Sequence, residues 1–114
     1  MRAIDAVTAH FKSLGTLHID VPEWQVDGKP MRIFYTPVTI AEREKLTAKS
    51  GSDLDLEVLL LKAKDEAGKP LFTIEDKMIL RSAGVSGVIQ RVSLAITAVP
   101  TVEESEKNSE AIPS

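Results

Sequence analysis

The sequence predicts an α+β fold: a mostly helical single domain with one antiparallel β-hairpin near the N-terminus and a disordered acidic C-terminal tail. Three observations lead to this prediction. Apolar residues recur with helical spacing in the first fourteen residues and over most of the second half of the chain. Between about residues 17 and 35 the pattern changes to the alternation of strands around an Asp-Gly pair. After Pro100 the sequence is acidic and rich in serine, with little to bury.

The chain has 114 residues, of which 43% are hydrophobic and 27% are charged, as is typical of one folded domain. We expect the domain to span residues 1–99 and a flexible acidic tail to span residues 100–114. The absence of cysteine excludes disulfides, thiolate metal sites and a cysteine nucleophile. The net charge of -3 argues against nucleic acid as a partner, because phosphate binding needs clustered Lys and Arg.

Membrane insertion and export are not expected either. The longest aliphatic run, residues 58–61, is far shorter than the ~20 residues of a membrane-spanning helix. The first residues carry a base but lack the apolar stretch of a signal peptide. The sequence therefore predicts a cytoplasmic protein with no membrane partner.

The first predicted element is a helix over residues 3–14, which Gly15 ends. Its large apolar residues recur at spacings of three, four and three, which places them on one stripe of a helix. The stripe consists of Ile4, Val7, Phe11 and Leu14.

A β-hairpin is predicted next. Apolar and polar residues alternate over residues 17–21, and we expect Pro22 to end this strand. Asp27-Gly28 favours a tight turn with positive φ, and residues 31–35 form the returning strand. Because an isolated two-stranded hairpin is only marginally stable in water, it must pack on helices or on a partner.

Four further helices are predicted near residues 39–49, 53–66, 74–83 and 86–98. The first three begin with a hydroxyl residue followed three positions later by an acid, as in a capping box: Thr39 with Glu42, Ser52 with Asp55, and Thr73 with Asp76. We expect the second of these helices to end near Gly68, with Pro70 barring its continuation.

The last helix carries the widest apolar stripe of the chain: Val85, Val88, Ile89, Val92, Ile96 and Val99. Such a stripe is either buried in the monomer or offered to a partner, and burial is the simpler interpretation. The two hairpin aromatic residues Trp24 and Phe34 have the same two interpretations, a contact in the core or an anchor for a partner. The candidate partner-binding residues are therefore Trp24, Phe34, Val85, Val88, Ile89, Val92 and Ile96.

No motif indicates a catalytic, cofactor-binding or metal-binding residue. His10 and His18 lack a second ligand at metal spacing. The acids within residues 53–57 alternate as in a calcium loop, but leucines fill the gaps, and helix capping explains them better. Residues 84–87 resemble the clamp loop of some RNA-binding modules, although a break between two helices is the simpler interpretation. We therefore expect a binding protein and not an enzyme.

Several landmarks occur in a fixed order over about residues 3–98. They are a short N-terminal helix, a strand ending Val21-Pro22-Glu23-Trp24, the strand Met31-Arg32-Ile33 running into Thr36-Pro37-Val38-Thr39, then Ala41-Glu42-Arg43-Glu44, a Leu-rich helix, and Lys64-Asp65-Glu66-Ala67-Gly68-Lys69-Pro70-Leu71-Phe72-Thr73 before Glu75-Asp76. No single piece is diagnostic. Their combination resembles the tail assembly chaperones that long non-contractile-tailed phages encode upstream of the tape measure gene.

This resemblance implies a non-enzymatic chaperone in the host cell cytoplasm. It would coat the tape measure protein and keep it soluble until tail tube subunits polymerise around it, and would then be absent from the mature virion. The resemblance also implies a longer product made by ribosomal frameshifting, which recruits tail tube protein. Glu106-Lys107-Asn108 could be encoded with the slippery heptamer A-AAA-AAC, and an AAG codon at 107 would exclude this hypothesis.

Two other functions remain open, as does self-association. The first is a small structural virion protein, such as a tail-completion or head-tail joining subunit, which would be found in purified particles in fixed copy number. The second is a small enzyme or regulator with an unrecognised site, which would show a pocket with convergent polar groups.

Overall fold

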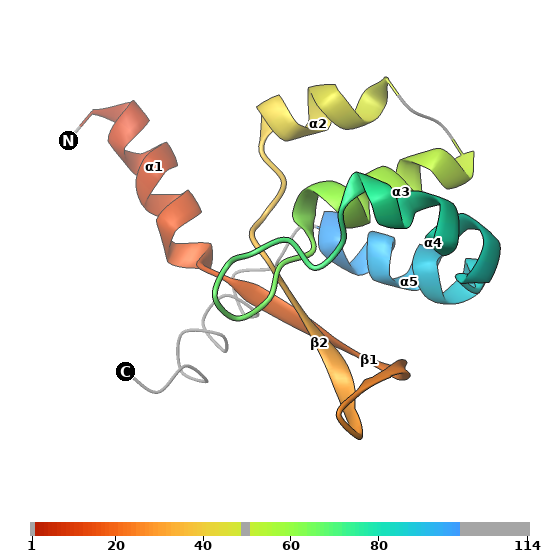
Figure 1. The fold of residues 1–114 in the computed structure, drawn as a ribbon. Coiled ribbons are helices and arrows are strands. Elements are labelled where there is room, and N and C mark those ends of the chain that lie inside the picture. Colours follow the sequence, from red (N-terminus) through yellow and green to blue (C-terminus); the bar gives the residue numbers. More distant parts are fainter. Residues whose placement is uncertain (1, 49–50, 99–114) are drawn as a thin grey trace.

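A computed structural model describes residues 2–48 and 51–98 of the chain. Its elements in order are α1 (Ala3–Leu14), β1 (Leu17–Val26), β2 (Lys29–Tyr35), α2 (Ile40–Thr47), α3 (Gly51–Lys62), the 3-10 turn η1 (Ile74–Asp76), α4 (Lys77–Ala83) and α5 (Ser86–Thr97). The later helices α2 to α5 gather on one side of the hairpin, and α1 stands apart from them (Figure 1). The predicted α+β fold, mostly helical with one N-terminal hairpin, is confirmed. The predicted domain boundary and tail lie outside the described residues.

The hairpin is longer than the sequence predicted. β1 continues beyond Pro22 to Val26, and its pairing with β2 shifts register between Val21 and Gln25. The prediction that Pro22 ends the strand is wrong, because a bulge accommodates a residue without an N–H between two paired stretches. The predicted turn is confirmed, since Asp27 and Gly28 have φ values of 53° and 78°.

The chain after α3 pairs with the hairpin and does not continue as a helix. α3 ends at Lys62, before the predicted end at residue 66. Phe34 and Lys64 each donate a backbone hydrogen bond to the other at 2.9 Å, and Lys64 also bridges to Pro70. Gly68, with φ of 87°, lies in the turn between these two positions. The prediction of Gly68 as a helix C-cap is therefore wrong, because the glycine serves a β-type turn.

Two predicted helix starts are found where the sequence placed them. The Glu42 amide donates to Thr39 Oγ1 at 3.2 Å, and the Thr39 amide donates to Glu42 Oε1 at 3.0 Å, which completes a capping box for α2. The Thr73 amide donates to Asp76 Oδ2 at 2.8 Å, but here a 3-10 turn precedes the short helix α4. The side chain of Ser52 lies outside the described part of the chain.

The core lies where one face of the hairpin meets α3 and α5. Its largest fully buried side chains are Val21 and Ile33 from the hairpin, Val58 and Leu59 from α3, and Val92 and Ile96 from α5. An ion pair between Arg91 and Glu23, with Nη2 and Oε1 2.6 Å apart, joins α5 to the β1 bulge. The hairpin is thus stabilised by helices, which is one of the two outcomes that the sequence allowed.

Candidate partner-binding site

Helix α1 is the element with the least contact to the rest of the fold. Only its last residue, Leu14, is buried, whereas Ile4, Val7 and Phe11 are 55%, 63% and 43% exposed. These are the residues of the predicted apolar stripe. An isolated helix of this length is marginal in water, since most helical stability comes from packing of an apolar face. The stripe of α1 is therefore an exposed apolar surface that the described part of the chain leaves largely uncovered.

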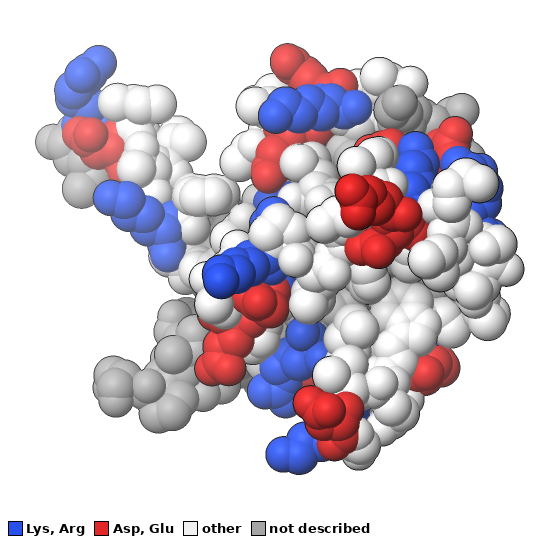
Figure 2. Space-filling view, viewed as in Figure 1, with Lys and Arg blue, Asp and Glu red and all other residues white. Residues whose placement is uncertain are grey.

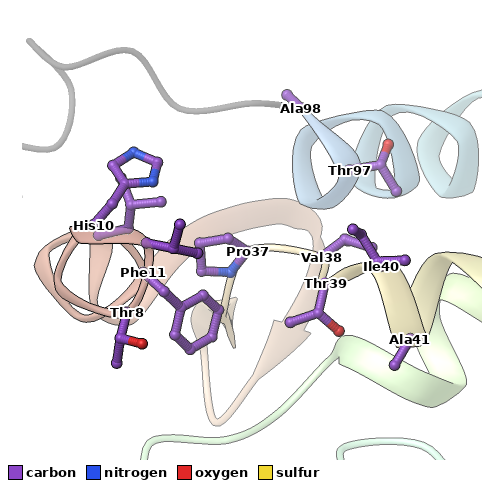
Figure 3. A pocket seen from close by; sticks show the side chains of 12 residues that line it. Thr8, His10, Phe11, Pro37, Val38, Thr39, Ile40, Ala41, Thr97 and Ala98 are labelled. Carbon is purple, nitrogen blue, oxygen red and sulfur yellow. The ribbon is translucent and has the colours of Figure 1, made fainter. Parts of the chain in front are cut away.

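A groove of about 740 Å³ lies beside this stripe. We call it the α1 groove. Its lining comes from α1, from the segment that leads into α2, and from the end of α5: Val7, Thr8, His10, Phe11, Leu14, Pro37, Val38, Thr39, Ile40, Ala41, Thr97 and Ala98. Figure 3 shows α1 with Phe11 on one side and Pro37, Val38 and Ile40 on the other. Ile40 is 78% exposed at this wall.

A buried lysine fixes the wall formed by residues 37–41. The Lys62 side chain is 3% exposed, and its Nζ lies 2.8 and 2.9 Å from the two carboxylate oxygens of Glu42. The same Nζ donates to Thr36 Oγ1 at 2.9 Å. Because Glu42 also caps α2 through Thr39, one network joins α3, the segment before α2 and the first turn of α2. A buried charge that is fully hydrogen-bonded in this way holds its partners in one geometry.

The charge state of Glu42 follows from this network. Burial raises the pKa of the Glu42 carboxyl, but hydrogen bonds from Lys62 and Thr39 and the positive charge of Lys62 together outweigh burial. The net pKa lies below its usual value. The carboxylate is thus ionised at neutral pH, and the wall of the groove is held by a full ion pair.

Four of the predicted partner-binding residues belong to the core. Val88, Ile89, Val92 and Ile96 are at most 9% exposed, so they offer no contact surface on the folded chain. The sequence favoured burial of this stripe, and burial is what the structure has. Val85 is different, because it precedes α5 and is 65% exposed. Val99 lies outside the described residues.

The two aromatic candidates lie on the hairpin, away from the α1 groove. Trp24 is half-buried in the β1 bulge and packs edge-on against Phe72, with ring centroids 6.0 Å apart. Phe34 is half-buried and lies 5.8 Å from the ring of His18. None of the seven predicted residues lines the α1 groove.

Sequence reasoning missed the groove because its two walls are far apart in the chain. The stripe of α1 was a visible signal, but it also fits an ordinary amphipathic helix that packs on its own domain. The second wall, residues 37–41, has no periodic pattern, because it is mostly an irregular segment ahead of a helix cap. Only the arrangement in space brings the two together.

Outside the α1 groove, the described residues carry interspersed charges (Figure 2) and smaller cavities. Within residues 2–48 and 51–98 no group of three or more His, Asp or Glu side chains could hold a metal ion, and no helix there is long and apolar enough to cross a membrane. Figure 2 shows basic and acidic side chains interspersed on the visible face. A cavity of about 360 Å³ lies beside Phe72 and Ile74, and another of about 100 Å³ lies beside Arg81 and Gly84.

Comparisons with protein-family models, with curated proteins and with solved structures give no match to this chain.

Proposed function

We propose that the protein is a non-catalytic chaperone of phage tail assembly that binds the tape measure protein through the α1 groove. One observation carries this proposal: a short helix exposes an apolar stripe beside an apolar groove. A groove of this kind fits the apolar face of an amphipathic helix, whose anchoring side chains recur every three or four residues. A long helical client offers many such faces, and each needs cover until tail tube subunits arrive.

The make-up of the groove suits a client that must later leave. Among the described residues, its lining contains apolar side chains, threonines and one histidine, with no Asp, Glu, Lys or Arg. Binding would therefore rely on apolar contact over a limited area, which gives moderate affinity and fast exchange. The protein would act in the host cell cytoplasm and be absent from the mature virion. A frameshifted longer product would bring tail tube protein to the same complex.

The test is co-expression with the tape measure protein, scored by the fraction of client that stays in solution. Ile40→Asp places a charge in the groove and should weaken client binding at least about tenfold, because a charge in an apolar contact costs more than about 1.4 kcal/mol. The soluble fraction of client should fall as a result. The matched control is Ile74→Asp. Ile40 and Ile74 each follow a capping threonine, are 78% and 70% exposed, and only Ile40 lines the groove.

Equal protection of the client by wild type and Ile40→Asp would contradict the assigned site. Mass spectrometry of purified virions tests the function separately, because a chaperone should be missing from the particles. A fixed copy number in virions would instead favour a structural subunit.

A further inference from the structure

The α1 stripe has the spacing of a coiled-coil seam. Its four residues, at intervals of three, four and three, occupy the a and d positions of successive heptads. The positions that flank this seam are Ala3, Thr8 and His10, whereas Asp5 and Lys12 point away from it. Two such helices can therefore approach each other without burying a carboxylate or an ammonium group.

The exposed pair of the stripe, Val7 and Phe11, is also symmetric about residue 9 of the sequence, whereas Leu14 is already buried in its own copy. When two α1 helices run antiparallel around a two-fold axis, Val7 of each copy faces Phe11 of the other. Each α1 then enters the groove of the other copy, between that copy's α1 and its residues 37–41. The chain thus carries both halves of a self-complementary contact, which is the requirement for an isologous dimer.

We propose that two copies of this chain associate through α1, with the stripe of each copy seated in the α1 groove of the other. The contact covers the most exposed large apolar residues of this region, Ile4, Val7, Phe11 and Ile40, in both copies. A contact limited to one short helix and residues 37–41 of each copy belongs to the class of small interfaces, below about 1,200 Å² in total, which are weak and exchangeable. The second copy supplies the packing that a helix of 12 residues lacks on its own body.

This dimer does not depend on the proposed chaperone function. The two are related only through the site, because a client helix and the α1 of a second copy cannot occupy one groove together. A weak dimer would cover the apolar surface between rounds of client binding.

Sedimentation of the full chain from about 1 µM to about 1 mM tests the association, since this range brackets weak dimers. Wild type should shift from monomer to dimer, and Val7→Lys should stay monomeric at every concentration. Ala9→Lys is the matched control, because residue 9 lies on the same exposed helix but off the seam, and it should dimerise as wild type does. Circular dichroism checks that all three chains keep their helices.

Crosslinking tests the geometry, because the chain has no native cysteine. A mixture of Val7→Cys and Phe11→Cys chains should form a disulfide-linked heterodimer at least about tenfold faster than Val7→Cys alone or a mixture with Ala9→Cys. A wild type that stays monomeric over the whole range would overturn the proposal, as would dimerisation of Val7→Lys or the loss of the crosslinking preference. If the chain is monomeric and still solubilises the tape measure protein, the dimer proposal is wrong and the proposed chaperone function stands.

Discussion

Helices α1 and α5 are both 12 residues long and both carry an apolar stripe, but the two stripes differ in how far the fold buries them. Val88, Ile89, Val92 and Ile96 of α5 are buried against α3 and the hairpin. In contrast, Ile4, Val7 and Phe11 of α1 are left exposed. An amphipathic pattern therefore predicts that one face of a helix will be buried. It does not predict whether the same chain or another molecule buries that face. The helix covered by the chain itself stabilises the fold, and the helix left uncovered is the candidate for binding.

Matched Ile→Ala substitutions give the largest expected contrast between the two helices. Ile96 in α5 is 0% exposed, and its truncation should lower the free energy of unfolding by about 2–5 kcal/mol, since it leaves a cavity. Ile4 in α1 is 55% exposed, and its truncation should change that free energy by less than about 0.5 kcal/mol. Urea denaturation of the two variants measures both values. Similar losses would mean that α1 packs on the body after all.

Removal of the lysine beneath the groove wall should have an intermediate effect. Lys62→Met leaves Glu42 without its partner, although Glu42 keeps 25% of its side chain exposed and can regain water. We expect a loss of about 1–3 kcal/mol in the free energy of unfolding, below the range for a fully buried pair. Hydrogen exchange of the first amides of α2 should accelerate more than that of α5. Equal acceleration of exchange in α2 and α5 would show that Lys62 stabilises the whole fold and does not hold the groove wall in particular.

The smallest effect concerns the exposed ion pair that joins α5 to the hairpin. The hydrogen bond from Arg91 lowers the pKa of Glu23 from 4.5 to about 2. Because the folded-state pKa is depressed, the pair stabilises the fold above pH 4.5 and loses this contribution as pH falls toward 2. Glu23→Gln should therefore flatten the decline in thermal stability over this window. An unchanged slope would show that the pair contributes nothing to folding in solution.

Features set by neighbouring residues were predictable. The helix over residues 3–14, the Asp27-Gly28 turn and the Thr39–Glu42 cap follow from spacing, φ preference and local hydrogen bonding. Features set by distant residues were not. Pro22 was predicted to end the first strand because its missing N–H is visible in the sequence. The bulge that accommodates it depends on the register of β1 with β2, which is set by distant residues.

The candidate site shows the same division. Its helix wall was visible as a stripe in the sequence. Its second wall and the Lys62–Glu42 pair that fixes it involve residues 20 positions apart, and no local pattern marks such a pair. The predicted binding residues on α5 show the opposite relation. Their apolar stripe was visible in the sequence, but packing against other elements places Val88, Ile89, Val92 and Ile96 in the core.

The sequence by itself determined the fold class, the positions of most elements and the presence of two apolar helix faces, because periodicity and capping act within a few residues. Only the tertiary structure decided which face is covered. Burial depends on which elements come together across the chain, and here α3 and the hairpin cover α5 while α1 extends beyond their reach (Figure 1).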